Sequence, residues 1–161
     1  MSDLFSLSRC TLAELDEAAE LFDKYRSFYG QSSDRDGCRR FLRDRISRQE
    51  SVIFLARIET RAVGFVQPYP SFSSIAINQI WILNDLFVLE SARQRGVGTE
   101  LLTAAEQFAR ESNAIRLTLA TGVENLSAQS LYEKLGWLRD NAYFHYLKPI
   151  EQSPPENPED V

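Results

Sequence analysis

The stretch "ESARQRGVGTELLTAAEQFA" (residues 90–109) carries two glycines, Gly96 and Gly98, at the point where a helical pattern begins. The apolar stretch directly before it, "INQIWILNDLFVL" (77–89), predicts a long strand that is buried on both faces. A strand, a glycine turn and a helix in this order are typical of α/β domains. The residues expected on the buried side of the helix recur at helical spacing and are Val97, Leu101, Ala104, Ala105 and Phe108.

The flanking sequence extends the pattern into a whole domain. A Thr-x-x-Glu capping box, Thr11 and Glu14, predicts the start of a helix that ends near Gly30. We predict one α/β domain with a mixed sheet over residues 1–149, without internal repeats. The other expected elements are strands at 5–9, 51–57, 62–69, 115–121 and 143–148, and helices at 36–48 and 126–135, with 51–57 and 62–69 forming a hairpin.

Composition narrows the classes of function. The chain has 161 residues, 43% of them hydrophobic, and a net charge of −5, which is typical of a globular protein and argues against a nucleic-acid partner. The sequence has no apolar run of about 20 residues and no signal-peptide pattern, so we expect no membrane association and a cytoplasmic location. Cys10 and Cys38 have no metal-ligand spacing, so no metal is expected. Residues 150–161 are acidic and proline-rich, which predicts a disordered tail that is either a solvated end or a docking motif.

The glycine turn has the chemistry of an anion site. The first N–H groups of a helix are free and lie at its positive end, and glycines allow close backbone approach. Arg93 and Arg95 add positive charge beside the turn. Neither a nucleoside-triphosphate loop nor a dinucleotide fingerprint fits, because no Gly-Lys pair is present and Leu101 stands where a third glycine is required. Alone, the turn is compatible with a phosphate site or with a purely structural role.

A second pattern decides between these alternatives. In "ENLSAQSLYEKLGW" (124–137), Asn125, Ala128 and Tyr132 share one face of a short helix. The pair of patterns resembles the GNAT superfamily of acetyl-coenzyme A-dependent N-acetyltransferases, and the order of elements over residues 5–148 resembles it too. Details such as "LNDLFV" are similar to the branch with polyamine-acetylating and histone-acetylating members. The resemblance implies a GNAT-type fold with a splayed central sheet.

The same resemblance implies how acetyl-CoA is bound. Backbone N–H groups of the turn hold the pyrophosphate, and the pantetheine arm lies along the central strand. The N–H of Val88 stabilises the oxyanion, Tyr132 protonates the departing thiolate and Asn125 contacts the cofactor arm. The implied cofactor-binding residues are Leu86, Phe87, Val88, Arg93, Gln94, Arg95, Gly96, Val97, Gly98, Thr99, Asn125 and Tyr132.

The acceptor side is less clearly marked. Members that acetylate protein N-termini carry a glutamate where this chain has Ala120, which counts against that substrate. Asp85 is the candidate base and acceptor contact. It is equally suited to a structural role, in which its carboxylate accepts hydrogen bonds from backbone groups where the strands of the sheet separate. Phe28, Tyr29 and Gln31 lie in a loop that borders the acceptor in this family. We expect direct transfer of acetyl from acetyl-CoA to a primary amine of a small molecule, polyamine or lysine side chain. The alternative is a non-catalytic acyl-CoA sensing module, and a homodimer is common in the superfamily.

Overall fold

The computed structural model describes residues 5–151, so all but the first two residues of the predicted acidic tail lie outside it. Five strands form one sheet in the order β1-β2-β3-β4-β5. Each pair of neighbours from β1 to β4 is antiparallel, and β5 is parallel to β4. The strands are β1 (Phe5–Arg9), β2 (Phe54–Ile58), β3 (Arg61–Ser73), β4 (Asn78–Val88) and β5 (Leu117–Thr118). The helices are η1 (Leu12–Glu14), α1 (Leu15–Phe28), α2 (Arg35–Ser47), η2 (Glu90–Ala92), α3 (Val97–Glu111) and α4 (Leu126–Lys134).

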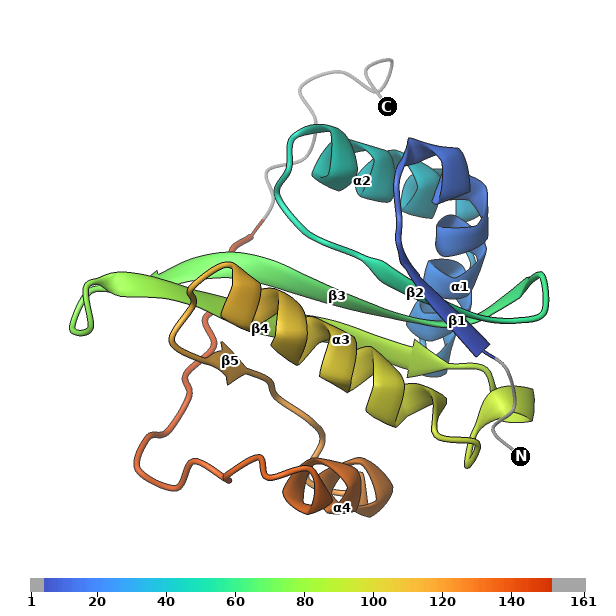
Figure 1. Cartoon of the computed structure of the whole chain (residues 1–161). Coiled ribbons are helices and arrows are strands. Elements are labelled where there is room, and N and C mark those ends of the chain that lie inside the picture. The colour runs from blue at the N-terminus through green and yellow to red at the C-terminus, as the bar shows by residue number, and fades with distance from the viewer. Residues whose placement is uncertain (1–4, 152–161) are drawn as a thin grey trace. The chain divides into compact units, whose positions relative to one another are not determined.

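Helices cover both faces of the sheet (Figure 1). A Cβ atom on Gly64 would lie 3.2 Å from the Leu101 side chain of α3, whereas the ring of the next residue, Phe65, packs 5.7 Å from the ring of Tyr25 on α1. Neighbouring residues of a strand point to opposite faces, so α1 and α3 lie on opposite sides of β3. Gly64 also allows the close approach of β4, because that Cβ would lie 2.9 Å from the Phe87 carbonyl oxygen.

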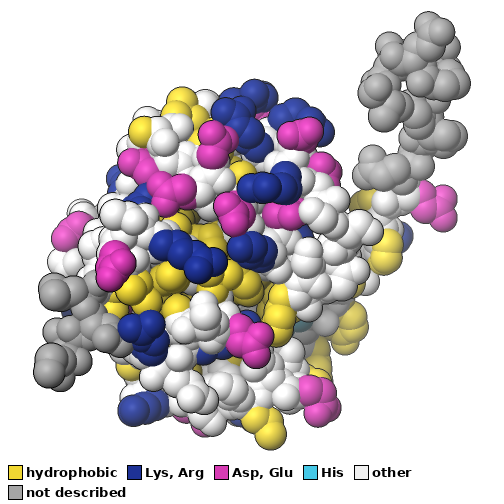
Figure 2. Space-filling model, turned by 90° about the vertical axis from the view of Figure 1, so that its right-hand side faces the viewer, with side chains coloured by type: hydrophobic (Ala, Val, Ile, Leu, Met, Phe, Trp, Pro, Cys, Tyr) yellow, Lys and Arg dark blue, Asp and Glu magenta, His cyan; other side chains and the backbone are white. Residues whose placement is uncertain are grey.

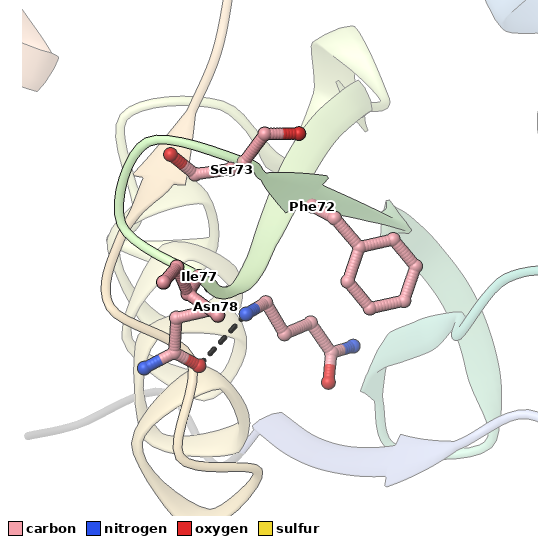
Figure 3. A pocket seen from close by; sticks show the side chains of 6 residues that line it. Phe72, Ser73, Ile77 and Asn78 are labelled. Atoms are coloured by element: carbon pink, nitrogen blue, oxygen red, sulfur yellow. Dashed lines mark hydrogen bonds between the residues drawn. The ribbon is translucent and has the colours of Figure 1, made fainter.

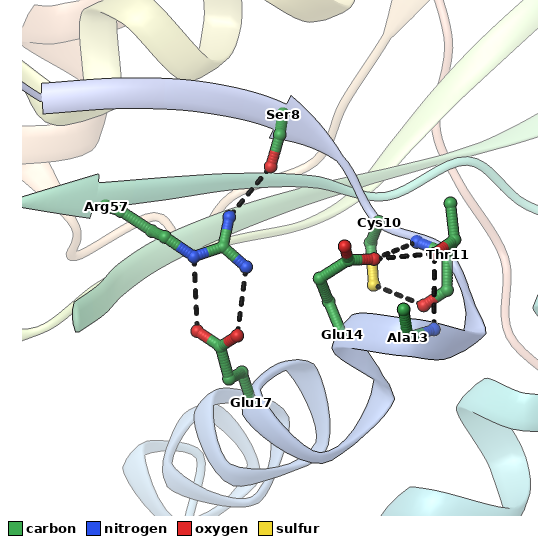
Figure 4. A network of polar contacts seen from close by, with 7 residues as sticks. All are labelled: Ser8, Cys10, Thr11, Ala13, Glu14, Glu17 and Arg57. Atoms are coloured by element: carbon green, nitrogen blue, oxygen red, sulfur yellow. Dashed lines mark hydrogen bonds and ion pairs between the residues drawn. The ribbon is translucent and has the colours of Figure 1, made fainter. Parts of the chain in front are cut away.

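Polar contacts fix the start of the chain to the sheet (Figure 4). The predicted capping box is present: the Thr11 hydroxyl accepts from the Ala13 N–H, and Glu14 accepts from the Thr11 N–H at 2.8 Å. Arg57 on β2 donates two hydrogen bonds to Glu17 on α1, at 3.1 and 3.2 Å, and a third to Ser8 on β1. These contacts join β1, β2 and α1 on the face of the sheet opposite to α3.

Contacts between residues divide the chain into two compact units, one up to Leu126 and one from Ser127. The sheet and helices α1 to α3 belong to the first unit, and most of α4 belongs to the second. The apolar core of the first unit is formed by α1, β2, β3, β4 and α3. Burying a side chain such as Leu101, which is wholly inaccessible, contributes about 1.5–3 kcal/mol.

Two strand predictions need correction. The strand expected at 115–121 is only the two residues of β5, and the strand expected at 143–148 is not formed. Residues 143–148 are exposed, including His145, and have no strand partner among the described residues. Aromatic and alternating residues favour a strand only when a neighbouring backbone edge accepts their hydrogen bonds, and the sequence pattern does not reveal that edge.

Candidate active site

The edge of β4 is open along its C-terminal half. The parallel partner β5 pairs only with Trp81 and Ile82, whereas β3 pairs with β4 as far as Val88. From Leu83 onwards, therefore, β4 has a strand on one side only among the described residues. This is the splay that the family resemblance implies, and it leaves backbone groups able to pair with an extended ligand.

A bulge decides which backbone groups face the opening. Gln67 of β3 pairs with Asp85 and its neighbour Pro68 pairs with Leu83, so Asn84 is an extra residue in β4. Beyond the bulge, the Leu89 N–H donates to the Val63 carbonyl at 2.8 Å, on the β3 side. Successive residues of a strand alternate between its two edges, so the N–H and C=O of Val88 point away from β3, towards the open edge.

The glycine turn follows directly and ends in a helix N-terminus. Gly96 has φ of +83°, a left-handed conformation that costs glycine little and strains other residues. The first intrahelical bond of α3 runs from the Glu100 N–H to the Gly96 carbonyl, at 3.1 Å. The N–H groups of Val97, Gly98 and Thr99 therefore precede the helical ladder, and no side chain caps this helix end. These donors at the positive end of α3 fit a phosphate group.

Arg93 connects the turn to two other parts of the site. Its Nε donates to the Val88 carbonyl at 3.1 Å, and its guanidinium lies 5.5 Å from the centre of the Phe28 ring. The residue is otherwise exposed to solvent, as are Gln94 and Arg95. One side chain thus touches both the open edge of β4 and the end of α1, where the predicted acceptor loop begins.

Asp85 lies in a buried network of polar side chains. Its carboxylate accepts from Gln67 Nε2 at 2.7 Å and from Asn84 Nδ2 at 3.1 Å, and the Tyr25 side chain is close enough to lower its pKa as well. Gln67 in turn accepts from the Ser51 hydroxyl at 2.7 Å. Both of these hydrogen-bond donors are side chains, and among the described residues no backbone N–H of the splay donates to the carboxylate.

Burial changes the acidity of this network. Removal from water raises the pKa of Asp85 above its usual value, and the hydrogen bonds from Gln67 and Tyr25 oppose that rise only in part. Burial and the nearby Asp85 charge also raise the pKa of Tyr25, and they raise the pKa of Tyr69 to about 12. A buried carboxyl group with a raised pKa is typical of sites that exchange protons.

Sequence reasoning identified Asp85 but missed Tyr25 and Gln67. Its helical spacing from Ala18 and Phe22 predicts that Tyr25 lies on the apolar face of α1, where its ring does pack, at 5.7 Å from Phe65 and 6.1 Å from Phe87. The available signal was Gln67, a polar residue in the middle of an otherwise apolar strand that proves to be fully buried. Such a residue requires buried partners, which the sequence does not identify.

The predicted acceptor residues lie at the end of α1 and just after it. Phe28 and Tyr29 are about 60% exposed, and their rings pack edge to face at 5.3 Å. The Tyr29 ring also lies 5.1 Å from Tyr25, so a series of aromatic contacts leads from the surface to the neighbourhood of Asp85. Gln31 is exposed beside them. Figure 2 shows a face on which exposed hydrophobic side chains lie next to Lys and Arg side chains.

The remaining two predicted residues lie at and beyond the boundary between the units. Asn125 directly precedes α4, and Tyr132 is a half-buried residue of α4 in the second unit. The Tyr132 ring lies 6.0 Å from Trp137, whose N–H donates to the Tyr132 carbonyl at 3.0 Å. The chain reverses between them at Gly136, with φ of +88°. These contacts fix the local geometry of Tyr132, and its catalytic role stays a prediction.

The two cysteines are unsuited to covalent catalysis. Both thiols are buried, and burial raises the pKa of Cys10 to about 12 and also raises that of Cys38. A thiol is nucleophilic only as thiolate, so both are inert at neutral pH. Among the described residues no group of acidic, His and Cys side chains has the arrangement of a metal site, and no helix is long and apolar enough to span a bilayer.

A surface hollow at the other end of β4 is unrelated to these features. It has a volume of about 460 Å³ and is formed by the turn between β3 and β4, with Phe72, Ser73, Ile77 and Asn78 around it (Figure 3). Asn78 and Val88 are the two ends of β4, and at about 3.3 Å per residue they lie roughly 33 Å apart. The hollow is therefore too remote to hold a group that reacts at the open edge.

Comparison with known proteins agrees with this geometry. Residues 15–137 match the acetyltransferase (GNAT) family. The chain is 46% identical over 128 residues, 80% of this chain and 86% of its relative, to "Uncharacterized N-acetyltransferase YhfO" of Bacillus subtilis. A "Probable acetyltransferase" of Haemophilus influenzae is 37% identical over 98 residues, 60% of this chain and 67% of the relative.

Solved structures confirm the predicted fold class. The crystal structure of a probable acetyltransferase has 44% identity and a TM-score of 0.86, covering 92% of this chain and 99% of its own. The aminoglycoside N-acetyltransferase AAC(6')-Iy in complex with CoA has 19% identity and a TM-score of 0.77, covering 91% of this chain and 96% of its own. At 19% identity, the similarity to the aminoglycoside N-acetyltransferase shows the fold alone.

Proposed function

The chain belongs to the acetyltransferase (GNAT) family, and we propose that it transfers acetyl directly to a primary amine of a small molecule, polyamine or lysine side chain. It is an acetyl-CoA-dependent N-acetyltransferase, and the identity of the acceptor is the part that we infer. The observation that carries the proposal is the open edge of β4 beside the N-terminus of α3. These two features fit the extended arm and the phosphates of acetyl-CoA, respectively.

In the proposed binding mode, most contacts to acetyl-CoA come from backbone groups. The pantetheine arm lies along the open edge of β4, against the outward backbone groups of Leu86, and its thioester end reaches Val88. Val97, Gly98 and Thr99 direct their N–H groups to the pyrophosphate, and Arg93 and Arg95 add positive charge. Acetyl-CoA supplies an activated thioester when bound. The Val88 N–H donates to the acetyl carbonyl oxygen and stabilises the negative charge that develops there.

Among the proposed cofactor residues, Phe87 differs in that its side chain lies on the α1 side of the sheet. Its backbone lies between Leu86 and Val88, but its ring packs against Phe65 and Tyr25 on the α1 side. We therefore assign its side chain to the wall of the acceptor site. Gln94, with φ of 60°, and Gly96 shape the turn so that the next N–H groups face outward.

The proposed chemistry is direct attack without an acetylated enzyme. Asp85 removes a proton from the acceptor ammonium, and the Tyr132 hydroxyl protonates the departing thiolate. The inert thiols of Cys10 and Cys38 support the absence of a covalent intermediate. We further propose that residues 1–149 act as one catalytic domain.

A cationic amine fits the proposed acceptor side. Phe28 and Tyr29 offer exposed ring faces, which attract ammonium groups, and Asp85 provides a negative charge further in. Gln31 adds an amide that is able to accept a hydrogen bond from the same ligand. Ala120, at a position where a glutamate serves the acetylation of protein N-termini, supports a different acceptor.

One assay tests the proposal. The full-length protein is incubated with acetyl-CoA and a panel of amines that includes polyamines, small monoamines and a lysine peptide, and free thiol is measured. We expect thiol release that requires an amine and forms one acetylated product for each thiol. Tight acetyl-CoA binding by calorimetry without transfer to any amine in the panel would contradict the proposed acceptor class.

A further inference from the structure

We propose that Tyr25 is the proton-transfer residue between the acceptor amine and Asp85, an inference that rests on the function proposed above. The path runs from the ammonium nitrogen to the Tyr25 hydroxyl oxygen, while the Tyr25 proton passes to the Asp85 carboxylate. Nothing in the glycine-turn pattern or in α4 points to Tyr25, which comes from the first helix. The assignment comes from the contacts of its ring and from its interaction with Asp85.

The burial of Asp85 is the first reason. Only 4% of this residue is exposed, and Gln67 and Asn84 occupy its two oxygens at 2.7 and 3.1 Å. A bulky ammonium compound therefore has little access to the carboxylate itself. A group that lies beside Asp85 and also reaches towards the surface is needed. The half-buried Tyr25 side chain packs on Phe65 and Phe87, two residues from Gln67 and Asp85 on the same face of the sheet, and acts on the pKa of Asp85.

The position of the Tyr25 ring is the second reason. It packs against Phe65 at 5.7 Å, against Phe87 at 6.1 Å and against Tyr29 at 5.1 Å. Phe87 precedes Val88, the residue proposed to hold the acetyl carbonyl, and Tyr29 belongs to the proposed acceptor loop. Tyr25 thus lies between the reacting end of β4 and the surface aromatic residues, with its orientation fixed by three rings.

The charges around Asp85 are the third reason. The groups that act on its pKa are Gln67, Tyr25 and Asn84, and none is a cation, so this carboxylate is not half of a buried ion pair. A buried carboxylate without a cation destabilises a fold, and such groups are commonly kept for function. The cation that the site lacks is supplied by the acceptor ammonium.

The proton transfer is balanced and needs no additional reactant. The ammonium N–H bond breaks as an O–H bond forms on Tyr25, and the original Tyr25 O–H bond breaks as one forms on Asp85. The neutral amine keeps its electron pair for attack on the acetyl carbonyl. Burial raises the pKa of Tyr25, so a lasting tyrosinate is disfavoured and the two transfers occur together.

The test compares Tyr25→Phe with Tyr69→Phe. Tyr69 is the matched control because it feels the Asp85 charge but has no hydrogen bond to it, and its substitution removes the same hydroxyl. With an amine that is protonated at the assay pH, Tyr25→Phe should lower kcat by about 10²-fold. With a weakly basic amine that is already neutral, the loss should be less than about threefold, because no proton has to be removed. Tyr69→Phe should match the parent with both amines.

A second measurement does not depend on turnover. The pKa of the Asp85 carboxyl is followed by NMR of labelled protein without substrates, in the parent and in Tyr25→Phe. Loss of a hydrogen bond to the charged form raises the carboxyl pKa, so the titration and the acidic limb of the kcat/KM profile should both move to higher pH. Tyr69→Phe should leave both in place.

Three results would overturn the assignment. They are an unchanged Asp85 titration in Tyr25→Phe, an equal rate loss with protonated and neutral amines, and an equal loss in Tyr69→Phe. Tyr25→Phe combined with Asp85→Asn should be no slower than Asp85→Asn alone, because the two groups act on one proton. Acetyl transfer by the parent protein is the separate test of the proposed function, so failure of one is distinguishable from failure of the other.

Discussion

The two sides of β4 are built in different ways. On the open edge, the proposed cofactor contacts are backbone groups of Val88 and of the first turn of α3. On the α1 side, the proposed acceptor contacts are side chains that come from α1, β3 and β4. A backbone site depends on chain conformation and tolerates side-chain changes, whereas a side-chain site fails when one functional group is removed. Substitutions on the two sides should therefore affect different steps.

The largest effect is expected from Tyr132→Phe. The variant keeps the ring that lies 6.0 Å from Trp137 but lacks the proton proposed for the departing thiolate. General acid catalysis contributes about 10²–10⁴-fold, so single-turnover acetyl transfer at saturating acetyl-CoA should slow by that factor. Acetyl-CoA affinity should stay the same. A rate within twofold of the parent would assign protonation of the thiolate to water.

Asp85→Asn should lower kcat by about 10²-fold with protonated amines, because the proton acceptor is lost. At neutral pH, Asp85→Asn should raise the free energy of unfolding, although it lowers activity. The pKa of Asp85 is raised in the folded state, so protonation of Asp85 favours folding at low pH, and this contribution is lost as the pH rises from about 3.8 through the raised value.

Denaturant unfolding of the parent and of Asp85→Asn, from pH 4 to pH 7.5, checks this sign. The stability of the parent should fall relative to that of Asp85→Asn as the pH rises. A parent that instead gains stability relative to the variant would mean that the ionised Asp85 carboxylate is a structural group.

Gly98→Leu tests the backbone side of the comparison. A bulky side chain near the first N–H groups of α3 should obstruct the phosphates and weaken acetyl-CoA binding at least tenfold, about 1.4 kcal/mol, by calorimetry. Thr103→Leu, at an exposed position of the same helix, is the matched control and should bind normally. If both variants bind acetyl-CoA like the parent, the turn does not hold the phosphates.

The smallest effect is expected from Phe28→Ala. An exposed aromatic ring contributes about 0.5–1 kcal/mol to binding a cation, so the KM for the amine should rise about two- to fivefold. The Kd for acetyl-CoA should not change. A larger change in acetyl-CoA affinity than in amine KM would show that Phe28 acts through Arg93, 5.5 Å from its ring, on the cofactor side.

The contrast between a backbone site and a side-chain site also explains which features of the molecule can be predicted from the sequence. The order of elements as far as α4 and the start of α3 follow from local patterns, such as apolar periodicity and the conformation that Gly96 allows, whereas the open strand follows from the family resemblance. The hydrogen bonds of Asp85 do not follow, because Gln67 and Tyr25 lie 18 and 60 positions away in the chain and meet only in the folded sheet. Residues 143–148 show a related limit, since a strand pattern does not specify a partner edge.

The central claim is that the open edge at Val88 and the N-terminus of α3 together hold acetyl-CoA. The most direct measurement is an experimental structure of the full chain with a non-hydrolysable acetyl-CoA analogue. We predict that the analogue's acetyl carbonyl oxygen lies about 3 Å from the Val88 nitrogen and that its pyrophosphate accepts from the N–H groups of Val97, Gly98 and Thr99. An analogue bound elsewhere, with the Val88 N–H more than about 4 Å from any of its oxygens, would contradict the claim.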